Sequence, residues 1–397
     1  MTSAALGIQA VGIVSPIGGD RKTVAAALAA GTRAGLMPRS DLVPEKTVYV
    51  GAIREDLPAI PADLAVYDCR NNRVMLAALA QIRDEIEVAI SRFGRHRIAV
   101  LLGTSTGGIA EGEAAYDLFR RSGNWPQGFS YRQQEVGGLA EFVARFLGLT
   151  GPAYTVATAC SSSGKAFASA RRLIKAGLCD AALVGGADTM CRMTANGFST
   201  LEAVSAGLCN PFSANRDGIN IGEAAAAFLL TREPAPVQLL GIGESSDAHH
   251  VSAPDPEGHG AIEAMRLAMK DAGLDAADIG YINLHGTATP LNDSMEGKAV
   301  HALFGSTVAC SSTKAMTGHT LGAASACEAA FVWLTLHPDF NAGLLPPHLW
   351  DGIADPMIPP LELAQPGMRV STAGKAGMLS NSFAFGGSNV TLAFGRG

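Results

Sequence analysis

The feature that most constrains the fold of this chain is a repeated alternation of short apolar runs with stretches of helical spacing. We expect a helix that Asp20 caps and that ends at Ala30. We expect further helices at 71–93, 161–176, 257–273, 293–303 and 321–336. The apolar runs predict strands at 7–14, 97–103, 153–157, 181–185, 224–231, 237–243, 281–284, 308–311, 370–373 and 389–394. This alternation predicts an α/β fold, in which 224–231 and 237–243 are adjacent strands.

Size and composition indicate a well-buried globular protein. The chain has 397 residues, of which 48% are hydrophobic and 17% charged. At roughly 100–200 residues per domain, this length predicts two or three domains, or two halves that share one core. The sequence has no Pro/Ser-rich linker, so we expect tight packing. Ala159-Cys160-Ser-Ser162 and Ala309-Cys310-Ser-Ser312 each follow or end a predicted strand, which is a weak sign of duplication.

Charge and targeting signals narrow the functional class. A net charge of −6 argues against a general nucleic-acid binder, although it allows a local basic patch. We find no basic start followed by an apolar core, and no uninterrupted apolar run of about 18 residues. The seven cysteines have no CxxC spacing, and no His/Cys cluster has the pattern of a zinc site. We therefore expect a cytoplasmic protein with free thiols, no membrane span and no metal.

A candidate nucleophile lies where a predicted strand gives way to a predicted helix. Cys160 follows 153–157 and precedes 161–176. The free amides at a helix N-terminus lower the pKa of a nearby thiol, and acyl transfer needs such a nucleophile. We interpret Ser161–Ser163 as cap and turn residues. An arbitrary cysteine is more often buried and inert, which is the interpretation we keep for Cys179, Cys191, Cys209, Cys310 and Cys327.

Two histidine motifs lie in the second half of the chain. In Asn283-Leu-His285-Gly-Thr-Ala-Thr-Pro290, a histidine at a strand end followed by glycine suits a side chain that points into a cleft. Its two threonines could bind an extended polar ligand, and an ordinary polar turn is an equal alternative. Gly318-His319 opens a helix rich in small residues.

Lys314 and Glu328 flank His319 in the sequence. Glu328 falls within an otherwise apolar helix, and a buried carboxylate needs a partner. Lys314 is the natural partner. Taken by themselves, the two residues are better explained as a structural ion pair than as catalytic groups.

The last motif combines aromatic residues with a glycine pair. Phe383, Phe385 and Gly386-Gly387 suggest a mobile loop that approaches a ligand. A tight turn between two strands explains them equally well.

The order of these motifs resembles the β-ketoacyl-[acyl carrier protein] synthase I/II family of condensing enzymes. Met316-Thr-Gly-His319 and Phe385-Gly-Gly-Ser-Asn389 are its most specific parts. The resemblance extends from about Tyr154 to the C-terminus. Residues 1–150 match more loosely, through the opening strand and the turn 103–108.

The resemblance implies a thiolase-like fold, which has two similar α/β halves in five layers. We place the halves at 1–233, with the nucleophile, and at 234–397, with a histidine pair and a gate loop. The family is usually dimeric, so we expect a homodimer or a heterodimer with a related ketosynthase or chain-length subunit.

The resemblance also implies roles for particular residues. Cys160 would be the nucleophile, His285 and His319 the catalytic pair, and Lys314 and Glu328 the residues that orient this pair. The amides of Cys160 and Phe385 would form an oxyanion hole, with Phe385 as the gate between the acyl pocket and the malonyl site. The implied substrate contacts are Thr287 and Thr289 for the pantetheine arm, Thr106 for the acyl chain, and Asp247, His250 and Phe383 around the gate.

The implied reaction is a decarboxylative Claisen condensation that lengthens an acyl chain by two carbons. Its substrates are carried on the phosphopantetheine of acyl carrier protein, and no other cofactor is expected. The carrier is typically acidic, so the candidate docking residues are basic: Arg70, Arg73, Arg120 and Arg121.

Three departures from the common pattern leave this chemistry intact but open the choice of substrate. Cys160 is followed by Ser161-Ser-Ser163, as in polyketide-type ketosynthases, while Ala288 and Ala384 replace a common serine and glycine. A specialised polyketide or aryl-polyene pathway is therefore an alternative to fatty-acid synthesis.

Rival functions fit the sequence less well. A thiolase of this fold would carry a second catalytic cysteine near the C-terminus, and no cysteine follows Cys327. A hydrolase would have no use for a gate loop and two histidines. An inactive chain-length subunit would not need Cys160, His285 and His319.

Overall fold

The two halves of the molecule repeat one arrangement of strands. The computed structural model describes residues 5–370 and 377–397. In the first half the strand order is β5 (Ala153–Val156), β4 (Ile98–Gly103), β6 (Ala181–Asp188), β8 (Ala224–Thr231) and β1 (Leu6–Val14). In the second half it is β11 (Ala309–Ser311), β10 (Ile279–Asn283), β13 (Gly377–Phe383), β14 (Ser388–Arg396) and β9 (Val237–Ser246).

Strand directions repeat as well. In each half the second strand of the order runs parallel to the first and third, and the remaining pairs are antiparallel. The halves join where β1 pairs with β9 at Leu6–Leu239 and Gly7–Gln238. The weak Cys-Ser-Ser repeat falls at the equivalent strands β5 and β11, although Cys160 follows its strand and Cys310 lies within its own.

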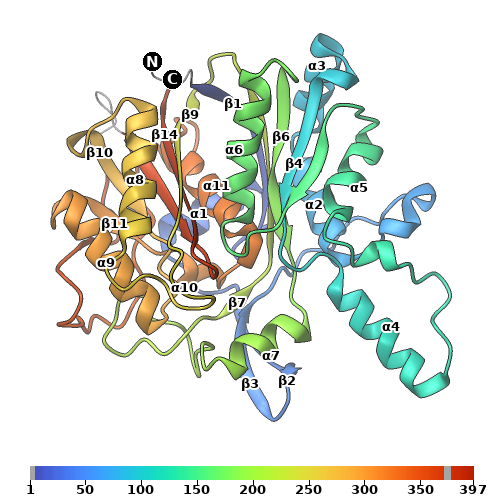
Figure 1. The fold of residues 1–397 in the computed structure, drawn as a ribbon, viewed down its shortest axis with the longest axis horizontal. Helices are drawn as coiled ribbons and strands as arrows, with labels where there is room; N and C mark the ends of the chain where they lie inside the picture. Colours follow the sequence, from blue (N-terminus) through green and yellow to red (C-terminus); the bar gives the residue numbers. More distant parts are fainter. Residues whose placement is uncertain (1–4, 371–376) are drawn as a thin grey trace.

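Helices separate and cover the halves in five layers. Figure 1 shows α6 (Ser162–Lys175) and α11 (Ala324–Leu336) between the halves, where the two helices contact each other. On the outer faces α2 (Arg70–Ala80) and α5 (Gly138–Leu147) cover the first half, and α8 (His259–Ala272) and α9 (Pro290–Phe304) the second. Three apolar cores fill the four interfaces between these layers: one packs both faces of the central helical layer, and one lies under each outer layer. The expected five-layered α/β arrangement is confirmed, whereas the boundary at 233/234 stays a prediction.

Several helices and strands differ from the sequence-based expectation. The helix expected at 71–93 is two helices, α2 and α3 (Arg83–Phe93). The Gln81 side chain between them donates to the carbonyls of Ile13 (2.8 Å) and Gly19 (3.0 Å) instead of facing solvent. The strands 224–231 and 237–243 are not adjacent, because β1 lies between β8 and β9 and pairs with both.

Other segments were predicted correctly, missed or lie outside the described residues. The Asp20 side chain caps α1 (Arg21–Ala30) by accepting from the amides of Lys22 (2.8 Å) and Thr23 (2.9 Å). Most of the strand expected at 370–373 lies outside the described residues. The sequence did not predict α4 (Ile109–Ser122), α5, α7 (Arg192–Thr200), β13 or the hairpin of β2 (Leu36–Val43) and β3 (Lys46–Gly51).

All seven cysteines are free, as expected, and buried. Within residues 5–370 and 377–397, no helix has both the length and the apolar character needed to cross a membrane.

Close packing of α8 on β9 requires glycine, which has no side chain, at position 243. A Cβ atom at Gly243 would lie 1.8 Å from the carbonyl oxygen of Ala264, whereas one at Gly197, within α7, would meet nothing within 4 Å. We expect Gly243→Ala to lower the free energy of unfolding by about 1–3 kcal/mol, because the helix must shift. Gly197→Ala is the matched control and should raise it by up to about 1 kcal/mol. Denaturant titration measures both, and equal effects would contradict this account of the packing.

Candidate active site

Cys160 sits in a strained turn at the start of the central helix α6. Ala159 before it has φ +51°, which is uncommon for alanine. Its carbonyl accepts from the hydroxyls of Ser162 (2.5 Å) and Ser105 (3.2 Å), which stabilise this conformation. Ser161 is at the N-cap position of α6, but no side chain caps this helix, so the expected capping by serine side chains is wrong. Ser161 and Ser162 donate instead to the carbonyls of Thr158 and Ala159, which confirms their expected role as turn residues.

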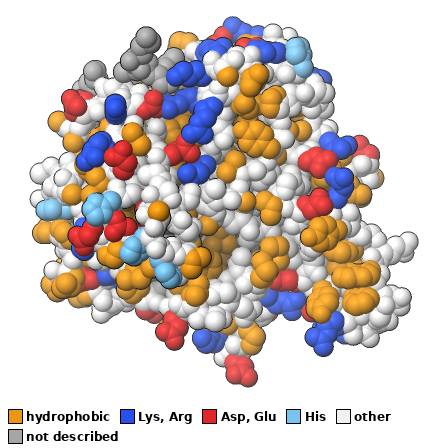
Figure 2. All heavy atoms as spheres, viewed as in Figure 1, with side chains coloured by type: hydrophobic (Ala, Val, Ile, Leu, Met, Phe, Trp, Pro, Cys, Tyr) orange, Lys and Arg blue, Asp and Glu red, His pale blue; other side chains and the backbone are white. Residues whose placement is uncertain are grey.

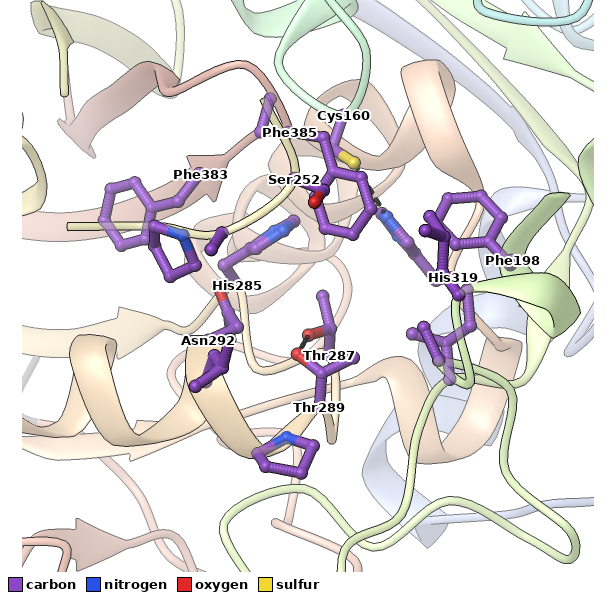
Figure 3. Close-up of a pocket in the computed structure, with 18 of the residues that line it drawn as sticks. Cys160, Phe198, Ser252, His285, Thr287, Thr289, Asn292, His319, Phe383 and Phe385 are labelled. Carbon is purple, nitrogen blue, oxygen red and sulfur yellow. Dashed lines mark hydrogen bonds between the residues drawn. The ribbon is translucent and has the colours of Figure 1, made fainter. Parts of the chain in front are cut away.

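The loops before α11 and after β10 bring two histidines to this turn. His319 Nε2 lies 3.0 Å from Cys160 Sγ, as the dashed line in Figure 3 marks. The rings of His285 and His319 are nearly perpendicular, with centroids 5.4 Å apart. Gly318 has φ +70°, and a Cβ there would lie 2.8 Å from the carbonyl oxygen of Ile221, so glycine is required beside His319. All three side chains are buried.

Burial controls the protonation of all three groups. It raises the pKa of the Cys160 thiol to about 11, while Lys314 and the amides of Phe385 and Cys160 itself act in the opposite direction. The low thiol pKa expected from the helix N-terminus is therefore wrong, because loss of hydration outweighs the amide dipoles. Burial and the charge of Lys314 keep the pKa of both histidines well below the ordinary value. The site thus holds a neutral thiol beside two neutral imidazoles.

Lys314 and Glu328 form a buried ion pair behind the histidines. Lys314 Nζ donates to Glu328 Oε1 and also to the carbonyl oxygen of His285. Burial raises the pKa of Glu328 to about 7 even though Lys314 lowers it. The pair expected from the sequence is present, and its lysine directly contacts the backbone of His285.

A buried carboxylate that the sequence analysis missed also holds His285. Glu296 of α9 accepts from the amides of His285 and Gly286, each at 2.7 Å, and from Asn381 Nδ2 at 3.2 Å. Burial raises the pKa of Glu296 to about 7. No signal in the predicted helix 293–303 distinguishes Glu296, because Asp293 and Lys298 are also charged residues of that helix.

The glycine pair forms a tight turn between β13 and β14. Gly386 and Gly387 have φ +83° and +72°, whereas Ala384 does not have positive φ. Gly386 donates to the Val251 carbonyl at 2.8 Å, and the Phe385 ring lies 5.6 Å from that of Phe198. The amides of Phe385 and Cys160 both act on the thiol and lower its pKa, and their expected role as an oxyanion hole stays a prediction.

One pocket leads from the surface to Cys160 and has a volume of about 240 Å³. Figure 3 shows Phe385 beside Cys160, with Thr287 and Thr289 away from the thiol. The two threonine hydroxyls are 3.0 Å apart. The lining residues from the sequence-based set are Cys160, Asp247, His285, Thr287, Thr289, His319, Phe383 and Phe385.

Two of the expected substrate contacts do not line this pocket. The Thr106 hydroxyl donates to the buried carboxylate of Asp188 at 2.7 Å, so it serves the turn after β4. His250 is exposed, and its Nδ1 accepts from the amides of Ser252 and Ala253. It shapes the loop beside the pocket.

The four candidate docking arginines differ in their surroundings. Arg70 is bound to Glu223 at 2.6 Å and Arg73 to Asp68 at 2.6 Å, so both charges are already paired. Arg120 and Arg121 are exposed in the last turn of α4. Carrier docking on any of them stays a prediction.

Comparison with known proteins agrees with this geometry. Residues 70–235 match the family description "Beta-ketoacyl synthase, N-terminal domain", and 237–349 match "Beta-ketoacyl synthase, C-terminal domain". The chain is 31% identical to 3-oxoacyl-[acyl-carrier-protein] synthase 2 of Staphylococcus aureus, covering 98% of this chain and all of that protein. This chain belongs to the β-ketoacyl synthase family. It is a thiolase-like condensing enzyme and therefore an acyltransferase.

Specialised ketosynthases are among its structural relatives. A chain from the complex of the ketosynthase ApeO with its chain length factor ApeC, from Xenorhabdus doucetiae, is 47% identical. That comparison has a TM-score of 0.94 and covers 99% of this chain and 98% of that one. The ishigamide ketosynthase/chain length factor is 27% identical, with a TM-score of 0.87 over the whole of both chains.

Removing Lys314 should damage both stability and activity. Lys314→Met leaves Glu328 buried without its cation, which should cost about 3–5 kcal/mol of unfolding free energy at pH 8. The pKa of Glu328 is already about 7 and rises further without the lysine. The folded state then binds a proton more readily than the unfolded state, so the deficit should shrink at pH 6.

The double variant Lys314→Met/Glu328→Gln is the matched control. It should recover most of the stability, because no buried charge remains, but not the activity. Thermal melts and turnover at both pH values measure this. A single variant that is fully stable at pH 8 would contradict the buried-pair account.

The hinge of the gate turn should lie at the glycine pair. A Cβ at Gly387 would lie 2.9 Å from Asp247 Cβ, at a φ of +72°. We expect Gly387→Ala to slow acylation of Cys160 by long acyl donors at least several-fold, since left-handed backbone costs alanine about 1 kcal/mol or more. Ala384→Gly is the control and should change the rate little. Single-turnover labelling of Cys160 gives both rates. An unchanged rate in Gly387→Ala together with a changed rate in Ala384→Gly would place the hinge at Ala384.

Proposed function

We propose that Cys160 carries the growing acyl chain as a thioester while His285 and His319 promote decarboxylation of malonyl-carrier protein. The observation that carries this proposal is the 3.0 Å contact between Cys160 Sγ and His319 Nε2 inside a buried pocket. A neutral thiol with a raised pKa is a poor nucleophile until a base takes its proton. His319 is placed to accept it as the sulfur attacks.

The first half-reaction moves the acyl group onto the enzyme. Cys160 Sγ attacks the thioester carbonyl of the acyl-carrier protein, and its proton passes to His319 Nε2. The resulting oxyanion accepts hydrogen bonds from the amides of Cys160 and Phe385, each worth roughly 2–4 kcal/mol in a dry site. The carbon–sulfur bond to the carrier then breaks, and the departing thiolate takes the proton.

The second half-reaction forms the new carbon–carbon bond. Malonyl-carrier protein loses CO₂, and the enolate oxygen accepts hydrogen bonds from the neutral histidines. The enolate carbon attacks the acyl carbonyl on Cys160, and the sulfur leaves as a thiolate that takes up a proton from solvent to restore the thiol. Lys314 and Glu296 are positioning residues in this scheme, because both hold the backbone of His285.

We propose that the substrates arrive on acyl carrier protein. The S. aureus relative is named for this carrier. Thr287 and Thr289 lie along the pocket, where they can bind the amides of a phosphopantetheine arm. A cytoplasmic location stays a prediction.

We also propose a specialised pathway in which this chain pairs with a chain length factor. The 47% identity to a chain of the ApeO–ApeC complex supports it. The edge strand β5 lies at the end of the sheet, with Tyr154 on it 41% exposed. Tyr116 and Leu118 of α4 and the following Trp125 are also exposed, and Figure 2 shows apolar side chains gathered over α4. A second subunit would cover this apolar region.

Replacing the nucleophile separates the two half-reactions. Cys160→Ala should abolish condensation, because no thioester can form, while decarboxylation of malonyl-carrier protein should persist at His285 and His319. Cys179→Ala, another buried cysteine, is the control and should condense normally. Product formation is followed by mass spectrometry and CO₂ release. Condensation at a wild-type rate in Cys160→Ala would overturn the proposal.

A further inference from the structure

The three reactive side chains of the pocket also form a set of metal donors. Suitable atoms of Cys160, His285 and His319 all lie within 4.8 Å of one another. These residues are far apart in the sequence, which is why no metal-binding spacing predicts the cluster. The fold alone brings together one sulfur and two imidazole nitrogens.

This donor set is the one that Zn²⁺ prefers. Zinc binds cysteine sulfur at about 2.3 Å and histidine nitrogen at about 2.0–2.1 Å, which places tetrahedral ligand atoms roughly 3.5 Å apart. Cys160 Sγ and His319 Nε2, at 3.0 Å, need to separate only slightly. The side chains line one end of the pocket, so a fourth position faces the substrate space.

The surroundings permit the rings to present their nitrogens to a metal. Nδ1 of both His285 and His319 has no hydrogen-bond partner among the described residues, so neither tautomer is fixed, although the acceptor that usually orients a metal-bound histidine is missing. Lys314 is the nearby cation that opposes a metal ion, and Glu328 pairs with it. Asp188 is a further buried carboxylate whose charge acts at Cys160.

We propose that the substrate pocket binds one Zn²⁺, or a similar soft divalent ion, through Cys160, His285 and His319, and that this ion is an inhibitor. Binding replaces the thiol proton, which leaves through the pocket, with a sulfur–metal bond. The bound metal then prevents Cys160 from attacking the thioester and prevents His285 and His319 from donating hydrogen bonds to the enolate. Metal binding is independent of the proposed condensation, whereas its inhibitory effect depends on that function.

Binding is measured first, without any assay of catalysis. Competition with a chromophoric chelator should show one tight Zn²⁺ site per chain. Zn²⁺ should protect Cys160 from alkylation by iodoacetamide, and EDTA should reverse the protection. Co²⁺ should give a thiolate-to-metal charge-transfer band, which Cys160→Ser removes. Mg²⁺ should do none of these things, because hard cations prefer oxygen ligands.

Variants assign the ligands. Loss of a residue that merely supports a ligand weakens metal affinity about 10–100-fold, so Cys160→Ser, His285→Asn and His319→Asn should each weaken it at least about tenfold. Exposed histidines are the competing explanation, because Figure 2 shows several on the surface near α8 and α9. His259→Asn is the matched control, since His259 is exposed and lies 2.6 Å from Asp255. It should leave the affinity unchanged.

Each outcome is decisive. Unprotected Cys160, no charge-transfer band in the wild-type protein, or a loss of binding in His259→Asn instead would overturn the zinc site. The wild-type measurements hold even if a pocket variant does not fold, which metal-free melts reveal. Tight zinc binding to a chain that shows no condensation at all would keep the site and reject the proposed function.

Discussion

The contact between Cys160 and His319 depends on the burial of two helices against each other. Cys160 lies just before α6 and His319 just before α11, and both helices lie between the two halves of the molecule. Ser163 of α6 accepts from the amide of Ala326 in α11 at 2.9 Å, which fixes their relative position. Gly164 allows this approach, because a Cβ there would lie 2.5 Å from Val390 and 2.9 Å from Ser325. The site is therefore a consequence of the interface between two repeated halves.

Burial then determines the chemistry that this contact can perform. In a dry centre neither a thiolate nor an imidazolium is favoured, so the thiol and the imidazoles are neutral. Neutral groups can exchange a proton during acyl transfer and can donate hydrogen bonds to an enolate. They carry no charge in the resting site. Lys314 is buried beside them, and Glu328 balances its charge. Because Glu328 pairs with Lys314, the buried cation can act on the site without the free-energy cost of an unpaired charge in the interior.

Much of this arrangement could be predicted from sequence, because its parts are local. The strand-to-helix turn at Cys160 and the glycine before His319 are short-range signals, and their order indicated the family. The thiol pKa was predicted in the wrong direction, because a helix N-terminus is visible in sequence while burial depends on both halves. Glu296 was missed because nothing nearby in sequence shows that its carboxylate faces the backbone of His285. Arg70 was a docking candidate, and its pairing with Glu223 was missed because Glu223 is distant in sequence.

The central claim is that Cys160 holds the acyl chain, and the most direct test is to trap that intermediate. The protein is incubated with candidate acyl-carrier proteins in the absence of malonyl-carrier protein, digested, and analysed by mass spectrometry. We expect one acyl group per chain, on the peptide that contains Cys160, with the mass of the preferred donor. An acyl group on another residue, or none with any donor while condensation product still forms, would contradict the account.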